Sequence, residues 1–143
     1  MIKTQNELSI SDAEWEVMRI VWTLGQAGSS QIIDQLQVKN NWTESTIKTL
    51  LRRLCQKGYL KTEKDGRKFI YSATVDQTNM MYEETKAMLN KMCDMHKGQL
   101  LIKLMTDIPL SKADLKLLSE EITTKEKTAP DQVKCNCLPG IDC

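Results

Sequence analysis

The chain has 143 residues, 41% of them hydrophobic, and a formal net charge of +1, which suits one ordinary domain or a small domain with an appendage. Because the net charge is near zero, a nucleic-acid-binding surface has to come from local clustering of basic residues. The N-terminus, MIKTQNELSISDAEW, lacks the apolar run of a secretory signal, and no stretch approaches membrane length. We therefore expect a cytoplasmic protein with no membrane partner and with reduced thiols. Its five cysteines, an odd number, also fit poorly with a disulfide framework.

The first two expected helices follow residue 10. The pattern Ser11-Asp-Ala-Glu14 predicts a capping box, in which each of these two side chains accepts the other's backbone N–H. The helix that it opens is apolar nearly all round and runs to about Leu24, so we expect it to be central and buried. After Gly25 and Gly28, Ser29 is expected to cap a short helix through Ile32, Ile33 and Leu36.

A third helix and a hairpin complete this part of the chain. The segment from about Thr43 to Lys57 predicts a helix stopped by Gly58. The sequence YLKTEKDGRKFIYSAT then predicts two strands around Asp65-Gly66. Three helices followed by a hairpin are the layout of a winged helix-turn-helix. We therefore expect a mostly α protein in which residues 1–75 form a winged-helix DNA-binding domain.

The third helix has an apolar face and a basic one. At about 100° per residue, the side chains that turn to the core are Ile47, Leu50, Leu51 and Leu54. The opposite side is polar and basic, with Glu44 as its one carboxylate, and carries Ser45, Thr46, Lys48, Thr49, Arg52, Arg53 and Gln56. The hairpin adds Lys61, Lys64, Arg67 and Lys68. This pattern favours a helix in the major groove with a wing on the phosphates; the alternative is solubilising charge on a protein-interaction domain.

The motifs ISDAEWEVMRIVW and NWTESTIKTLLRRLCQKGYL, followed by KFIYSAT, resemble the BlaI/MecI/CopY family of bacterial winged-helix repressors over about residues 8 to 124. The resemblance implies a homodimer that blocks a promoter by binding an inverted repeat in double-stranded operator DNA. Carried over by position, it implies DNA contacts from Ser45, Thr46, Lys48, Thr49 and Arg52. It further implies support from the wing residues Arg67 and Lys68.

Residues 76–124 predict three short amphipathic helices. Asp76 or Thr78 caps the first, Gly98 breaks the pattern before the second, and the last opens at Ser111-Lys-Ala-Asp114 after Pro109. Such helices cannot enclose a core alone. We therefore expect a helical dimerisation region that sets two recognition helices about one DNA turn apart.

Two weak metal signals occur in this region. Its methionines are soft ligands, but their helical spacing favours a role in the core. Cys93-x-x-His96 lies near a helix end, and a single Cys with a single His is more often incidental. We therefore leave both out of the predicted metal site.

Residues 125–143 read as a charged linker followed by CNCLPGIDC. Cys135 and Cys137 can reach the same ion, and Pro139-Gly140 predicts a turn that brings Cys143 back toward them. Thiolates select Cu(I), zinc and similar metals. We therefore predict that Cys135, Cys137 and Cys143 bind metal. Redox sensing through a disulfide is the main alternative, and incidental thiols at a frayed terminus are another.

The tail resembles the CxCxxxxCxC element of the copper-responsive, CopY-type branch. Moreover, the Asn-Phe bond that is cleaved in β-lactam-responsive relatives is absent, because the one phenylalanine, Phe69, follows Lys68. The resemblance implies a repressor of copper-export genes. In that branch a zinc-loaded tail favours the DNA-bound dimer. Cu(I), delivered by a copper chaperone, displaces Zn(II), and the operator is released.

The tail also departs from the branch pattern, because it has three cysteines, spaced C-x-C-x5-C, where the family element has four. A closed zinc site needs a fourth donor, for which Asp142, the terminal carboxylate, water and a partner chain are candidates. Two further alternatives stay open. One is a repressor that responds to oxidants or to zinc, cadmium or silver, and the other is a copper-trafficking protein. An enzyme is not expected, since the chain has one His and no nucleophile or phosphate-loop motif.

Overall fold

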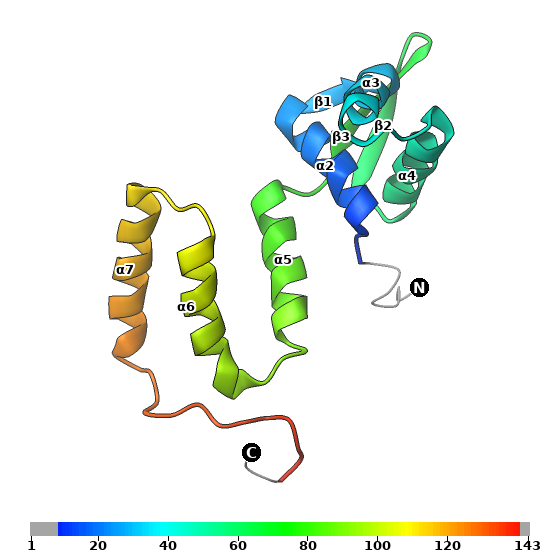
Figure 1. The fold of residues 1–143 in the computed structure, drawn as a ribbon. Helices are drawn as coiled ribbons and strands as arrows, with labels where there is room; N and C mark the ends of the chain where they lie inside the picture. The colour runs from blue at the N-terminus through cyan, green and yellow to red at the C-terminus, as the bar shows by residue number, and fades with distance from the viewer. Residues whose placement is uncertain (1–8, 141–143) are drawn as a thin grey trace. The chain divides into compact units, whose positions relative to one another are not determined.

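The computed structural model describes residues 9–140, and the chain divides into two compact units between Glu84 and Thr85 (Figure 1). The first unit holds α2 (Asp12–Leu24), β1 (Gln26–Gly28), α3 (Ser29–Asn40), α4 (Glu44–Gln56), β2 (Leu60–Asp65) and β3 (Lys68–Ala73). Helix α5 (Gln77–Leu89) begins in the first unit and ends in the second. The second unit continues with η1 (Asp94–His96), α6 (Lys97–Asp107) and α7 (Lys112–Glu126).

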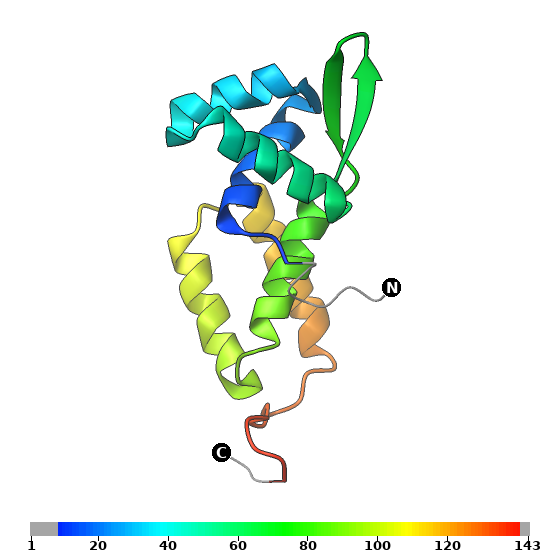
Figure 2. The same ribbon diagram turned by 90° about the vertical axis from the view of Figure 1, so that its right-hand side faces the viewer.

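The first unit is a winged helix, as the sequence predicts. Strands β2 and β3 form an antiparallel hairpin, and Figure 2 shows it projecting beside α4 as a wing. The turn is Gly66-Arg67 rather than the predicted Asp65-Gly66, because Asp65 still pairs with Lys68; Gly66 takes a positive φ of 65°. A third strand, β1, pairs with β3 and gives the order β1-β3-β2. This strand was not expected.

The core of the first unit comes from all three predicted helices. Its fully buried side chains are Val17, Met18, Val21, Ile32, Leu36, Ile47, Leu51 and Leu54. Trp22 closes the edge of this core, and its indole N–H donates to the carbonyl of Val75 at 3.0 Å. The start of α5 belongs to the same cluster through the buried Met80. Asp76 caps α5 as expected, since its carboxylate accepts the backbone N–H of Asn79.

The start of α2 forms only half of the predicted capping box. Ser11 accepts the backbone N–H of Glu14 at 3.1 Å. Glu14 is buried, and its carboxylate does not reach back to Ser11; it accepts hydrogen bonds from the Lys57 ammonium at 2.7 and 2.9 Å. A buried carboxylate is costly unless a charged group pairs with it, so the ion pair with Lys57 takes precedence over the cap. The pair therefore links the start of α2 to the residue that ends α4.

The start of α3 also differs from the prediction. Ser29 is the first helical residue, and Gly28 occupies the N-cap without a side-chain hydrogen bond. Gly28 is at the same time the last residue of β1, opposite Ile70 of β3. The chain therefore passes from strand to helix without a loop, which leaves Ser29 no room to act as the cap.

The helices after α5 have few buried contacts within one chain. No residue of α6 or α7 is buried, and large apolar side chains are exposed, among them Leu101, Ile102, Leu115, Leu117 and Ile122. Ser111 and Asp114 form the complete capping box that the sequence predicts. Gly98 lies inside α6 and does not break the pattern; the break falls at residues 90–93. In the described part of the chain, no helix has the length and apolar character needed to cross a membrane.

Candidate DNA interface and thiol cluster

Helix α4 is positioned by its cap and by its apolar face. Thr43 is the N-cap and accepts the backbone N–H of Thr46 at 3.2 Å. Ile47, Leu50, Leu51 and Leu54 are buried, as the periodicity predicts. Because these residues occupy one face of the helix, the opposite face is held rigidly toward solvent.

The outward face of α4 contains the five helix residues predicted to contact DNA. Ser45, Thr46, Lys48 and Arg52 are exposed, and Thr49 is half-buried with its hydroxyl bonded to the Ser45 carbonyl at 3.0 Å. A shallow depression on this face is lined by Glu44, Ser45, Lys48, Thr49 and Arg52. Hydroxyls beside cations are the groups that donate to phosphates and base edges.

Glu44 changes the electrostatics of this face. Its carboxylate lies 2.7 Å from the Lys48 ammonium, one helical turn away, and both side chains are about 60% exposed. Lys48 is therefore partly neutralised in the free protein. To bind a phosphate it has to leave Glu44, whereas Arg52 forms no ion pair within residues 9–140.

The wing carries charges of both signs. Arg67 lies in the turn, and Lys68 is exposed opposite Asp65. Since side chains alternate along a strand, Lys61, Glu63 and Asp65 share one face of β2, and Lys64 lies on the other with Phe69 of β3 opposite it. The wing therefore presents Arg67 as its basic tip, while Lys68 has an acidic neighbour in Asp65.

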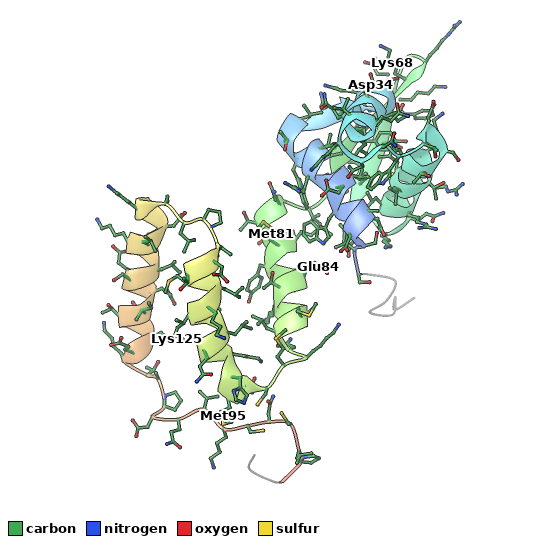
Figure 3. The ribbon with its side chains drawn as sticks, viewed as in Figure 1. Asp34, Lys68, Met81, Glu84, Met95 and Lys125 are labelled. Atoms are coloured by element: carbon green, nitrogen blue, oxygen red, sulfur yellow. The ribbon has the colours of Figure 1, made fainter. Side chains whose placement is uncertain are left out.

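A second site forms where the tail meets the turn between α5 and α6. The sulfur atoms of Cys93, Cys135 and Cys137 all lie within 4.8 Å of one another. Cys93 is the N-cap of η1, and the backbone N–H of the next residue, Asp94, donates to the side-chain oxygen of Asn136 at 2.9 Å. Figure 3 shows the tail passing beside the turn that carries Met95. Asn136 thus holds its two flanking cysteines against Cys93.

The thiols of this cluster are not equivalent. Desolvation raises the pKa of Cys93. A hydrogen bond from Cys137 and backbone N–H donors lower the pKa by more than this, so the net shift is downward. The same hydrogen bond to Cys93 raises the pKa of Cys137. Cys93 is therefore the first of these two to become a thiolate, the form that binds metal. Cys135 is disulfide-bonded in this structure, whereas Cys55, Cys93 and Cys137 are free.

The structure thus brings together two of the three predicted metal ligands and adds one that the sequence analysis left out. Cys135 and Cys137 lie in the cluster, and the third, Cys143, falls outside the described residues. Cys93 was set aside because Cys-x-x-His is a weak signal on its own. His96 acts through its backbone, which lowers the Cys93 pKa. Cys55, expected in the core, packs against it, and desolvation raises its pKa.

The fold and the exposed basic face of α4 define a winged-helix protein of the DNA-binding type. A family model described as penicillinase repressor matches residues 10–124. The chain is 32% identical over 116 residues to the methicillin resistance regulatory protein MecI of Mammaliicoccus sciuri, covering 81% of this chain and 94% of MecI. The chain therefore belongs to the penicillinase repressor family of transcriptional repressors.

Two other similarities were found. An uncharacterized 16.5 kDa protein in the ptsI 3′ region of Latilactobacillus sakei is 49% identical over 140 residues, covering 97% of this chain and 96% of that protein. A solution structure of the DNA binding domain of the repressor BlaI is 37% identical with a TM-score of 0.49, covering 55% of this chain and 93% of that one. The family match ends at residue 124, so the cysteines of the tail lie beyond it.

Proposed function

We propose that the chain is a homodimeric repressor that binds an inverted-repeat operator through α4 and responds to Cu(I) through its C-terminal cysteines. The observation that carries the DNA-binding half is the α4 face that lies opposite the buried apolar face and contains Ser45, Thr46, Lys48, Thr49 and Arg52. Membership of a repressor family supports the same function. Arg67 and Lys68 of the wing are the proposed phosphate contacts.

The proposed dimer uses the helices that follow the winged helix. Apolar side chains of α6 and α7 remain exposed in one chain, with Ile102 62% and Leu117 63% exposed. Burying apolar surface against a second copy contributes about 25 cal/mol per Å². Two linked α4 helices then match two half-sites about one DNA turn apart. Sedimentation equilibrium tests this step. We expect the wild-type chain to be a dimer and the Leu117→Glu variant to be a monomer. A monomeric wild-type chain contradicts the proposed dimer.

The proposed copper response rests on the chemistry of the tail. The thiols that the structure gathers are soft donors, which suit Cu(I) and zinc and disfavour magnesium or calcium. Cys135 and Cys137 with Cys143 hold the metal in this proposal, and the repressor leaves operators of copper-export genes when Cu(I), supplied by a copper chaperone, replaces Zn(II). The family match ends at residue 124, so these three cysteines lie outside the part of the chain that it covers.

The direct test is fluorescence anisotropy of a labelled inverted-repeat duplex with reduced, zinc-loaded protein, titrated anaerobically with Cu(I). We expect binding, followed by release at a few Cu(I) per chain. A variant with Cys135, Cys137 and Cys143 all changed to Ser is expected to bind DNA and to ignore Cu(I). If the wild-type protein binds the duplex but is unaffected by Cu(I), the proposed repressor function stands and copper is not its effector. If it does not bind the duplex at all, the proposed repressor function is wrong.

A thiol-redox repressor is the second candidate, because Cys135 is disulfide-bonded in the structure. Forming a disulfide from two thiols releases two protons and two electrons, which a small-molecule disulfide such as oxidised glutathione accepts. The same duplex assay separates the two functions. Release by oxidised glutathione without metal favours the redox response, and release by Cu(I) in excess reductant favours the metal response.

A further inference from the structure

We infer that Cys93 is a ligand of a three-thiolate Cu(I) site with Cys135 and Cys137, and that this site fixes the tail to the turn between α5 and α6. The inference deepens the proposed copper response and rests on it for the choice of ion. It adds a ligand from the helical region, outside the tail. It also makes the site complete without the fourth tail cysteine that the family element would supply.

The sulfur positions are close to those that one ion requires. For a metal–sulfur distance of about 2.3 Å, three sulfurs in a plane around an ion are about 4.0 Å apart. The three sulfurs here already lie within 4.8 Å of one another. Once Cys135 is reduced, shifts of less than about 1 Å bring all three onto one ion, and rotation about side-chain bonds provides shifts of that size.

The cluster is held by contacts of its own. Asp94 N–H donates to the Asn136 side chain at 2.9 Å across 42 positions of sequence. Cys137 N–H points to the Cys135 sulfur at 3.4 Å. Asp94 also pairs with Lys97 at 2.5 Å, which places a cation beside the cluster and orders the turn. The bond between Asp94 and Asn136 aligns the tail with η1 before any ion binds.

The donor set favours Cu(I) over structural zinc. Three thiolates satisfy Cu(I), whereas zinc in a structural site takes four ligands in a tetrahedron. Among the described residues the cluster contains no carboxylate and no imidazole. A single Cu(I) on three thiolates leaves a net charge of −2, which the Lys97 ammonium and the backbone N–H groups of η1 partly offset.

The position of Cys93 gives the site a way to act on the dimerisation region. An ion shared by Cys93 and Cys135 closes a loop that contains α6 and α7, the two helices with exposed apolar faces. A metal held by tail cysteines alone closes no such loop. Binding at this site therefore restrains both helices, and any difference in helix position between free and DNA-bound dimers is coupled to metal affinity.

The test compares the full chain with two single-thiol variants under reducing, anaerobic conditions. Competition with a chromophoric Cu(I) chelator gives the affinity, and X-ray absorption gives the number of sulfur ligands. We expect three sulfurs in the wild-type protein. Loss of a residue that only supports a metal ligand costs about 10-fold in affinity or more. We therefore expect Cys93→Ser to lower the Cu(I) affinity by at least ~10-fold and to show fewer sulfur ligands. Cys55→Ala, the matched control outside the cluster, is expected to match the wild type.

A second measurement uses the wild-type chain alone and does not depend on the variant folding. Cu(I) is expected to protect Cys93 from alkylation, read by mass spectrometry, while leaving Cys55 unaffected. An unprotected Cys93, or a Cys93→Ser variant with wild-type affinity and sulfur number, overturns the inference and leaves the tail-only copper response standing. If Cu(I) protects Cys93 but does not release the operator, the three-thiolate site stands and the proposed copper response is wrong.

Discussion

The buried pair of Glu14 and Lys57 is expected to be the most sensitive electrostatic contact of the winged helix. The Glu14 side chain is 3% exposed and the Lys57 side chain 21%, and both carboxylate oxygens bind the ammonium. Removing one partner of a buried pair costs about 3–5 kcal/mol, because the other charge is left without compensation. Since Lys57 retains some contact with water, we expect Lys57→Met to lie near the lower limit, about 3 kcal/mol.

The free energy of unfolding is measured by urea denaturation followed by tryptophan fluorescence. All three tryptophans, Trp15, Trp22 and Trp42, lie in the first unit, so the signal reports on the domain that contains the pair. For a slope of about 1–3 kcal/mol/M, a loss of 3 kcal/mol lowers the midpoint by about 1–3 M.

Two control variants decide whether burial is the cause. Lys39→Met removes the partner of Glu16 in a pair whose lysine is 46% exposed, and it is expected to cost less than about 1 kcal/mol. The double variant Glu14→Leu with Lys57→Met removes both charges and is expected to recover most of the loss. A Lys57→Met variant that loses no more than Lys39→Met, or a double variant less stable than either single one, refutes the reasoning.

Three further outcomes are expected. Arg52→Ala is expected to weaken operator binding by about 1–3 kcal/mol in anisotropy titrations, and an unchanged affinity places this residue outside the interface. Glu44→Gln frees Lys48 from its ion pair and is expected to strengthen DNA binding by up to about 1 kcal/mol, with a steeper salt dependence; weaker binding contradicts this. Because the pKa of Cys93 is lowered and that of Cys137 is raised, alkylation of reduced protein is expected to reach its plateau rate at a lower pH for Cys93 than for Cys137. The reverse order would contradict this assignment of the two thiols.

Patterns that repeat along the chain were predictable, and contacts between distant segments were not. Helix α4 follows from its apolar period between Thr43 and Gly58. Strand β1 has three residues, too few to show alternation, and it exists because β3 offers an edge for pairing. The sequence reading gave Glu14 a local partner, whereas Lys57, 43 positions away, binds it in the fold. Local pattern carries no information on such pairs.

The same limit applies to the candidate sites. The outward residues of α4 were predictable because the helical period assigns each position to a face. The role of Cys93 was not predictable, since it depends on the hydrogen bond by which Asn136 holds the tail beside η1. A weak motif such as Cys-x-x-His becomes informative once a pair of cysteines is known to lie beside it.

Glu44 has a consequence for how a repressor of the proposed kind searches a genome. A carboxylate on the face proposed to meet DNA would repel every phosphate, whatever the sequence, and it also competes for Lys48. The penalty is recovered only where base contacts hold the helix in register. With about 10⁶–10⁹ competing sites in a genome, weak binding to random DNA leaves more molecules free to find the operator. In the proposed repressor, the acidic residue among the basic ones thus shortens the time that the protein spends on wrong sequences.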